Sequence, residues 1–434
     1  MIRWSVVMNR KQRRELKKDK HLIKELYSII IKYLPELFDK FNKLTDIRNK
    51  SYITYDMKTI CVTRLFGLLC GLTSMTSITD NFNTEATIKN LSDICNTKLN
   101  ELPYWETIQD VFIHLDINEL RDIQKYITKA LMRSKMFDKY KFNNAFQLLF
   151  DGTGLTNHNY NLNGNCLTKK SKDGKISYYK YVLECKLVVG SIVISLDSEF
   201  IENEKMFNEN EKQDCEVKAF KRMITRIKKN YPKYTFIITG DGLYATTPII
   251  NICKKYHWFY IFNLKPERLK SINEMFEDNI KYNNETSRKN YYLSSNIEFK
   301  ENFINVFKYI EVKKKQEITF KYISNLKITN SNIKEIVSLG RKRWKIENEG
   351  FYMQKHRTFN ICHMNSRNDN AMKCHYFFIQ FAHTIRQLLE KGSIPIKSLN
   401  LKIKEVSALL LSNLTSTISD LNHLETNFQL RFDD

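Results

Sequence analysis

Two apolar runs decide the fold class of this chain, FQLLFD at residues 146–151 and YTFIITGD at residues 234–241. Each has the length and the β-branched and aromatic content of a buried strand. Each also ends in an aspartate that a glycine follows, Asp151 in the first run and Asp241 in the second. Two strands that each end in an aspartate indicate a sheet with carboxylates at one edge.

The segments around these runs alternate between strands and helices. The sequence predicts three strands, a helix, a strand, a helix and a strand, in that order. After the first run these elements are residues 178–186, 191–200, 211–230, 234–241, 247–256 and 258–264. Strands that alternate with helices imply parallel crossovers, so we expect a mixed α/β sheet.

Helical sequence surrounds this α/β core. Residues 1–140 predict one all-α N-terminal domain, which includes a basic helix from Arg10 to Phe41 and a buried apolar segment from Ile60 to Ile78. Residues 141–395 form the predicted catalytic domain. It is interrupted by a β-rich insertion at about 267–330, after which helical periodicity resumes at Ile333. Residues 396–434 are expected to form a C-terminal helical tail.

The composition favours a folded protein with a polyanionic partner. The chain has 434 residues, 42% of them hydrophobic, so a sizeable core is available and disorder of the whole chain is excluded. Its 70 Lys and Arg outweigh 48 Asp and Glu, for a net charge of +22. Such an excess favours nucleic acid, although an AT-rich genome also enriches lysine. Nine irregularly spaced cysteines, no signal peptide and no membrane span predict a cytoplasmic location.

The two aspartates suggest a metal site. In open α/β sheets, ligands bind beyond the carboxyl ends of the strands, and clustered carboxylates are commonly neutralised by Mg²⁺. The best third carboxylate is Glu347 in RWKIENEGF, with Arg343 one helical turn before it. Such a set suits in-line attack on a phosphodiester, with two metal ions that activate the nucleophile and stabilise the leaving oxygen.

Each of these residues also has an ordinary explanation. An aspartate followed by glycine is often a turn or cap residue, and Glu347 with Arg343 is often a surface ion pair. Lys265 follows a strand and could approach a phosphate, although solvated lysines are common. The combination of all three carboxylates in a basic chain favours the catalytic interpretation.

At this point the sequence resembles a family, the bacterial insertion-sequence transposases of the DDE class, in the branch with a β-strand insertion before the catalytic glutamate. The resemblance covers about residues 60–390. The segments that carry it are LPYWETIQDVF, LLFDGTGL, QDCEVKAFKRM, IITGDGLYA, YIFNLKPERL and RKRWKIENEGF. It implies a ribonuclease-H-like core of the retroviral-integrase type, with Asp151, Asp241 and Glu347 as catalytic, metal-binding residues.

The resemblance also implies the reaction and the partners. The implied reaction is cut-and-paste DNA transposition with two Mg²⁺ ions, or Mn²⁺ as an alternative. The implied partners are double-stranded DNA at the element ends and at the target, and a second copy of the chain in a synaptic homodimer. The implied location is the bacterial cytoplasm, at the nucleoid. Arg343 matches the arginine of that branch's Tyr-x2-Arg-x3-Glu-x6-Lys signature. The tyrosine position falls on Gly340 and the lysine position on Gln354, so Lys355, one residue later, is the candidate replacement for phosphate contact.

Two alternatives stay open from the sequence. One is a nuclease on the same fold that cleaves DNA without joining it, and the other is a catalytically decayed DNA-binding protein. The intact carboxylates favour the enzyme, whereas Gly340 and Gln354 favour the decayed protein. A strand-transfer assay separates the enzymatic alternatives, and salt-sensitive binding without cleavage identifies the decayed protein.

Overall fold

The computed structural model describes residues 21–204, 212–267, 269–278, 280, 282–285, 289–313, 316–418, 421, 424 and 427–433. The basic N-terminal stretch, with the part of the predicted helix from Arg10 to Lys20, lies outside the described residues, as does Glu211. Within the described ranges, no helix combines the length and the apolar character that crossing a membrane requires.

The chain divides into two compact units. The α/β unit comprises Asp138–Val189 and Val193–Phe351, and the helical unit comprises Met1–Phe137, Gly190–Ile192 and Tyr352–Asp434. The helical unit thus combines the N-terminal helices with those after Phe351, whereas the sequence-based division extends the catalytic domain to residue 395.

One mixed sheet forms the α/β unit. Its strands are β1 (Phe146–His158), β2 (Leu167–Lys170), β3 (Ile176–Val189), β4 (Ile192–Ile201), β5 (Phe236–Gly240), β6 (Phe259–Asn263), β7 (Tyr282–Glu285), β8 (Lys289–Phe299), β9 (Asn302–Lys313) and β10 (Gln316–Ser324). Their order is β2-β3-β1-β5-β6-β10-β9-β8-β7, and β4 also pairs with β3. β1, β5 and β6 run parallel, as the strand–helix alternation predicts. The α/β ribonuclease-H-like core with a β-rich insertion is therefore confirmed.

The insertion continues the same sheet. β10 pairs antiparallel with β6, and β9 and β8 follow it outward. Residues Ile333, Ile336 and Val337 of α12 (Ile333–Arg341) are buried with Ile237 and Ile261 of the central strands. The inserted strands thereby extend the core over which α12 packs.

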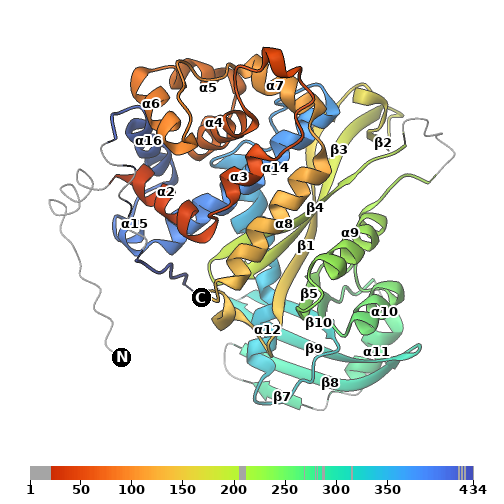
Figure 1. Cartoon of the computed structure of the whole chain (residues 1–434). Coiled ribbons are helices and arrows are strands. Elements are labelled where there is room, and N and C mark those ends of the chain that lie inside the picture. The colour runs from red at the N-terminus through yellow and green to blue at the C-terminus, as the bar shows by residue number, and fades with distance from the viewer. Residues whose placement is uncertain are drawn as a thin grey trace. The chain divides into compact units, whose positions relative to one another are not determined.

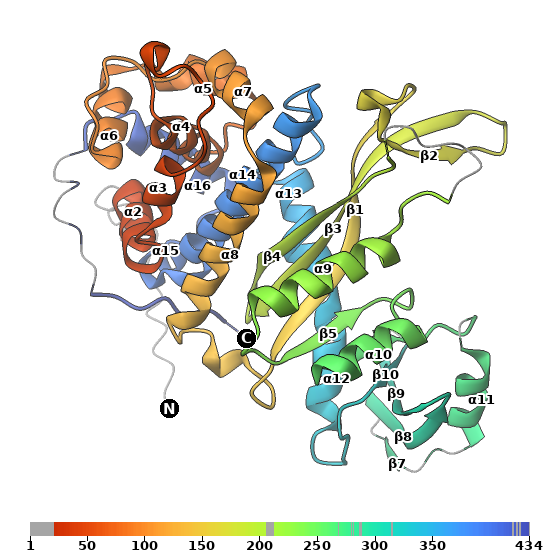
Figure 2. The same cartoon turned by 45° about the vertical axis from the view of Figure 1, so that its right-hand side comes forward.

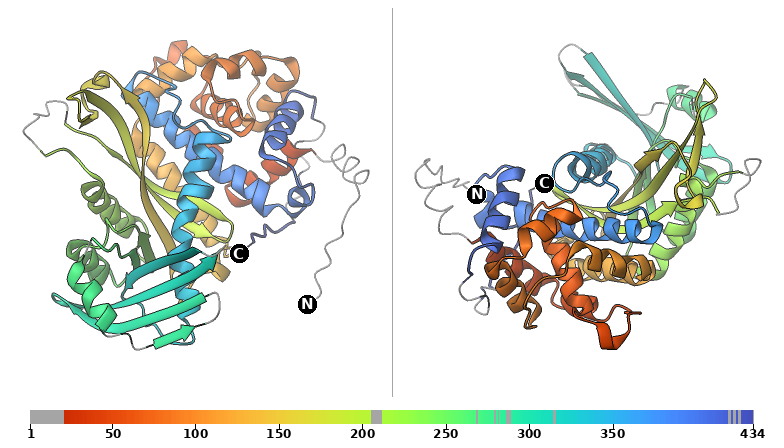
Figure 3. Two further views of the ribbon diagram at one scale, coloured as in Figure 1. Left: turned by 180° about the vertical axis from the view of Figure 1, so that it is seen from behind. Right: turned by 90° about the horizontal axis from the view of Figure 1, so that it is seen from above.

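Helices cover both faces of this sheet. α9 (Glu216–Asn230) and α10 (Thr247–Tyr256) lie in front of it in Figure 1. The view from behind shows α12 across the opposite face (Figure 3, left). A further short helix, α11 (Lys270–Asp278), contacts β8. On α9, Phe220, Met223 and Ile227 are fully buried, as its amphipathic pattern predicts.

Two local expectations are wrong. β1 does not end at Asp151 but continues to His158, because its outer half stays paired with β3 after its pairing with β5 stops at Leu149. The continuous helix expected after Ile333 is also interrupted. α12 gives way to a 3₁₀ turn at Lys342–Trp344 and a π-helical turn at Ile346–Phe351 before α13 (Tyr352–His356).

The helical unit is built around α14, which contacts α4, α7 and α8. Phe378 of α14 stacks on Phe112 and Phe41, with ring centroids 5.0 and 5.6 Å apart. Its elements are α2 (Leu22–Tyr33), α3 (Leu37–Asn42), α4 (Met57–Leu69), α5 (Met75–Phe82), α6 (Glu85–Cys95), α7 (Trp105–His114), α8 (Ile117–Arg133), α13, α14 (Asp369–Gln387), α15 (Ile394–Ser398) and α16 (Ile403–Leu414) (Figure 2). The expected helical character of the N-terminal region, with its buried apolar segment, is confirmed.

Candidate active site

Asp151 lies where β1 leaves the parallel part of the sheet. The pairing of β1 with β5 ends at Leu149, while Asp151 stays opposite Glu184 of β3. Its Oδ1 accepts a hydrogen bond from the N–H of Gly152 at 3.0 Å. Its Oδ2 lies 3.5 Å from Nη1 of Arg343, whose side chain is 11% exposed. The carboxylate thus sits at the edge that the sequence indicates, next to one predicted phosphate-binding arginine.

Asp241 directly follows β5, and its two oxygens have different partners. Oδ1 accepts a hydrogen bond from the N–H of Leu243 at 2.7 Å, so this residue does shape a turn. Oδ2 lies 3.5 Å from Nζ of Lys265, which follows β6. A Cβ on Gly242 would lie 3.1 Å from Cγ of Lys265, so the absence of a side chain at Gly242 lets the lysine lie close to the turn. The turn explanation considered from the sequence therefore applies to Asp241, and its Oδ2 is the oxygen that faces Lys265.

Glu347 lies near Asp151, although it belongs to the π-helical turn Ile346–Phe351, much later in the sequence. Glu347 is half-buried, and its carboxylate adds to the effect of burial in raising the pKa of Asp151. Residues Ile346 and Phe351 of the same turn are packed with Leu149 of β1 and Val188 of β3, which holds the turn against the sheet. π-helical turns are rare and are found frequently at functional sites.

The surroundings of Asp151 change the pKa of its carboxyl group. Burial is the main cause that raises the pKa of Asp151 to about 7, and the carboxylates of Glu347 and Glu216 raise it further, against the opposing effect of Arg343. A carboxyl group that titrates near neutrality marks a place where negative charge is crowded and poorly solvated. A cation bound there would relieve the repulsion.

Glu216 is an acidic residue of this neighbourhood that the sequence did not single out. It is the first residue of α9, and the hydroxyl of Tyr244 donates a hydrogen bond to its Oε1. A Cβ on Gly152 would lie 2.7 Å from Oε2 of Glu216 and 2.4 Å from Cε1 of Tyr181. Gly152 thus allows both side chains to pack beside Asp151. Burial and then Asp241 raise the pKa of Glu216, while the hydrogen bond from Tyr244 lowers it.

The acids on β3 and β4 have structural partners instead. Nε of Arg226 lies 2.8 Å from Asp197, and its Nη2 lies 2.8 Å from Glu199. Glu184 is fully buried, accepts hydrogen bonds from two serine hydroxyls and lies 3.1 Å from Nζ of Lys186. These carboxylates are held by partners on β3, β4 and α9 at short distances, which indicates a structural role.

The two departures from the family signature have physical explanations. A Cβ on Gly340 would lie 2.9 Å from the ring of Tyr322 on β10, so any side chain at residue 340 would collide with that ring as placed. Gln354 is fully buried and donates a hydrogen bond to Gln380 at 2.7 Å, with His383 at 2.9 Å. This glutamine packs inside the helical unit and does not face solvent.

The oxygen donors at this edge suit a hard divalent cation. Asp151 and Glu347 provide carboxylates from two separate elements, and burial, with the neighbouring carboxylates, raises the pKa of Asp151 against the effect of Arg343. As the side chains are placed, no group of three His, Cys, Asp or Glu residues in the described ranges is arranged to hold a metal ion. Asp241, engaged by Leu243 and Lys265, would have to reorient to complete a set of three.

Comparison with known proteins identifies a family. No curated protein matches this sequence. A family model described as a Transposase DDE domain matches residues 148–385, which include all three carboxylates and more than half of the chain.

Proposed function

The chain belongs to the family of transposases with a DDE domain, and from this premise we propose that Asp151, Asp241 and Glu347 are its three catalytic carboxylates. As a member of the family it is a DNA-binding enzyme of DNA transposition, which cleaves DNA and transfers strands, and enzymes of this family generally use divalent metal ions. The observation that carries the residue assignment is the interaction of Asp151 with Glu347, residues far apart in the sequence that both lie within the matched region.

The three carboxylates would hold two Mg²⁺ ions, with Mn²⁺ as an alternative. Bound metal supplies Lewis-acid activation of water or a 3′-hydroxyl and stabilisation of the leaving oxygen. Asp151 and Asp241, on neighbouring parallel strands, orient oxygen donors from a rigid sheet. Arg343 contributes a planar cation beside Asp151, suited to a bridging phosphate oxygen. Lys265 adds a second cation beside Asp241.

Lys355 completes the proposed phosphate contacts. A π-helical turn contains about one residue more than an α-helical turn, so the register after Ile346–Phe351 moves on by one position. The signature lysine expected at Gln354 is then replaced by Lys355, while Gln354 is turned into the helical unit. This register argument supports membership of the insertion-sequence branch with the β-strand insertion, which β7 to β10 also support.

The remaining organisation is proposed from the resemblance and the charge. Residues 1–140 would contact the repeats at the transposon ends, residues 141–395 would carry the catalysis, and residues 396–434 would form an accessory tail. A homodimer would hold two ends together for cut-and-paste transposition in the bacterial cytoplasm, at the nucleoid. The net charge of +22 supports tight, salt-dependent binding to double-stranded DNA.

The test is a cleavage and strand-transfer assay with DNA that carries the element ends, in the presence of Mg²⁺. Asp151→Asn, Asp241→Asn and Glu347→Gln should each reduce cleavage by on the order of 1,000-fold, since each removes a ligand that stabilises the transition state. Glu349→Gln is the matched control, because it changes the second glutamate of the same π-helical turn. An equal loss of cleavage in the control, or full cleavage by the three variants, would contradict the assignment. Cleavage without joined target DNA would instead indicate a nuclease.

A further inference from the structure

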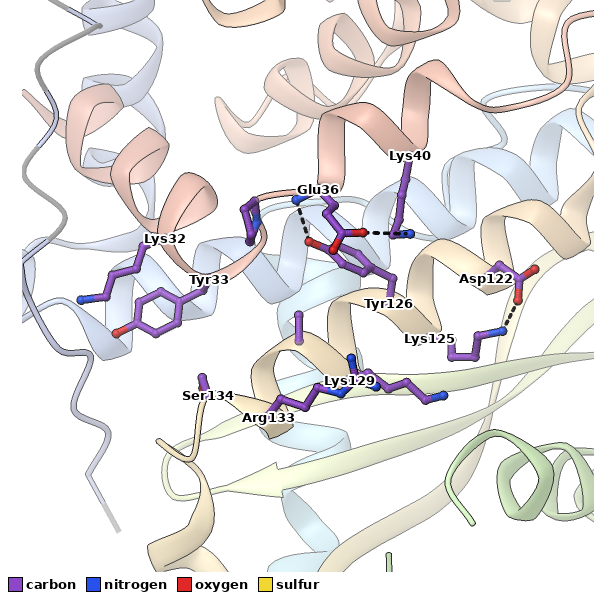
Figure 4. A pocket seen from close by; sticks show the side chains of 12 residues that line it. Lys32, Tyr33, Glu36, Lys40, Asp122, Lys125, Tyr126, Lys129, Arg133 and Ser134 are labelled. Carbon is purple, nitrogen blue, oxygen red and sulfur yellow. Dashed lines mark hydrogen bonds and ion pairs between the residues drawn. The ribbon is translucent and has the colours of Figure 1, made fainter. Parts of the chain in front are cut away.

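A cavity of about 700 Å³ lies within the helical unit, between α8 and the segment that joins α2 to α3 (Figure 4). None of its residues belongs to the proposed active site. Most of its charged lining residues are basic. The lining residues are Lys32, Tyr33, Pro35, Glu36, Lys40, Asp122, Lys125, Tyr126, Lys129, Ala130, Arg133 and Ser134.

Five cations and two acids leave this cavity with a net charge of 5 − 2 = +3. Glu36 lies 3.3 Å from Nζ of Lys40, and Asp122 forms an ion pair with Lys125. Both acids are therefore already used inside the cavity, as Figure 4 shows. Lys32 donates a hydrogen bond to the carbonyl of Phe428, a neutral acceptor.

The basic residues of α8 form a stripe, defined here as Lys125, Lys129 and Arg133. They follow one another at intervals of four residues, so they are neighbours on one face of the helix. Burial, and then the charges of Lys125 and Arg133, lower the pKa of Lys129. Like charges at this spacing destabilise a helix by a few tenths of a kcal/mol for each pair. A bound polyanion would reverse that penalty.

The dimensions of the stripe fit a nucleic-acid backbone. Eight residues of α-helix rise about 12 Å, and one strand of B-DNA carries a phosphate about every 3.4 Å along the axis. The stripe is therefore long enough to face several successive phosphates of one strand. A single small anion would contact only part of it. Tyr33 and Tyr126 add rings on which Lys32 and Lys40 lie, at 5.5 and 4.7 Å from the ring centroids.

We propose that this cavity, with the stripe on α8, is a binding site for the phosphate backbone of double-stranded DNA. The inference rests on the proposed function, because it assigns a definite surface to the DNA contact of the helical unit. The site recognises phosphates and not base edges, so it contributes affinity without sequence preference.

The experiment measures the affinity of the full chain for a 30-bp duplex of arbitrary sequence at several salt concentrations. The pocket variant carries Lys125→Gln, Lys129→Gln and Arg133→Gln, which keep side-chain length and helix propensity. The control variant carries Lys89→Gln, Lys98→Gln and Lys404→Gln, which are exposed residues of the same unit outside the cavity. Both variants lower the net charge by the same amount.

The pocket variant should reduce the slope of log K against log salt by about 0.9 for each phosphate that it no longer neutralises, a total of about 2 to 3. The control should reduce it by less than about 1. Equal slopes in the two variants, with circular dichroism that shows both folded, would overturn the proposal. Asp241→Asn, tested in parallel, should bind like the unmodified chain but fail to cleave, so failure of the DNA site and failure of the catalytic assignment give different patterns.

Discussion

The α/β unit and the helical unit each contain a concentration of like charge, and the two are of opposite sign. At the sheet edge, burial and then the carboxylates of Glu347 and Glu216 raise the pKa of Asp151 to about 7, against the opposing effect of Arg343. On α8, Lys129 lies between Lys125 and Arg133, and its pKa is lowered. Both clusters reduce stability in the isolated chain, because like charges repel and partial burial weakens their solvation.

A third cluster shows what a purely structural arrangement looks like. Asp197 and Glu199 on β4 share Arg226, and Glu199 and Asp214 share Arg222. Here every acid has a basic partner at hydrogen-bonding distance. A cluster in which acids and bases are paired thus stabilises the fold. A cluster in which one sign of charge predominates is expected to bind a partner of the opposite charge. A metal ion and DNA are the partners that fit the two clusters of like charge.

The largest expected loss of stability comes from the compensated cluster. Arg226→Gln would leave Asp197, whose side chain is 7% exposed, without its basic partner, and would leave Glu199 with Arg222 alone. Removing one member of a buried ion pair destabilises proteins by about 3 kcal/mol. Urea denaturation should show this loss, and Lys221→Gln on the exposed side of the same helix should change stability by less than about 0.5 kcal/mol. A loss in cleavage by the folded variant as large as that of Asp241→Asn would place Arg226 in the active site and break the distinction.

The next effect concerns the packing beside Asp151. Gly152→Ala would set a Cβ 2.4 Å from Cε1 of Tyr181 and 2.7 Å from Oε2 of Glu216, so one of them must move. We expect a destabilisation of about 2 kcal/mol and at least a tenfold loss of cleavage, because Asp151 is the adjacent residue. Gly154→Ala is the matched control, since its Cβ would meet only the ring of Tyr181, at 3.9 Å. Similar cleavage by both alanine variants would show that Glu216 and Tyr181 do not position the site.

The central strands, with Asp151 and Asp241 beside them, could be anticipated from sequence, because hydrophobic runs and the residues next to them are local patterns. The assignment of Asp151, Asp241 and Glu347 as catalytic stays a proposal. Glu216 could not be anticipated, since a glutamate in the first turn of a helix is ordinary, and only the fold brings it to Gly152. The continuation of β1 past Asp151 depends on pairing with β3, which is non-local. The π-helical turn at Glu347 likewise has no local signal, so the burial of Gln354 could not be foreseen.

The acidic cluster also predicts a pH dependence. Unfolded Asp151 ionises near pH 3.9, whereas in the folded chain its pKa is about 7. Stability from this group is therefore present below pH 4 and is lost as pH rises from 4 to 7. Because the side chain is 20% exposed, solvent screening reduces the effect, and we expect a difference of about 1 to 2 kcal/mol. Urea denaturation in EDTA at pH 5 and pH 8 measures it, and Asp151→Asn should remove it. Parallel pH profiles for the two proteins would contradict the crowding of charge at this edge.

The smallest effect tests the basic cluster without any DNA. Lys129→Gln removes the middle charge of the stripe, so two repulsive pairs disappear, Lys125 with Lys129 and Lys129 with Arg133. The helical unit should gain about 0.3 to 0.5 kcal/mol in low salt, and the gain should vanish at 1 M salt, where the Debye length is about 3 Å. Lys89→Gln provides the comparison on α6. A loss of stability in low salt would mean that Lys129 is held by attractive contacts, and the helical unit would then resemble the compensated cluster on β4 more than the acidic edge of the sheet.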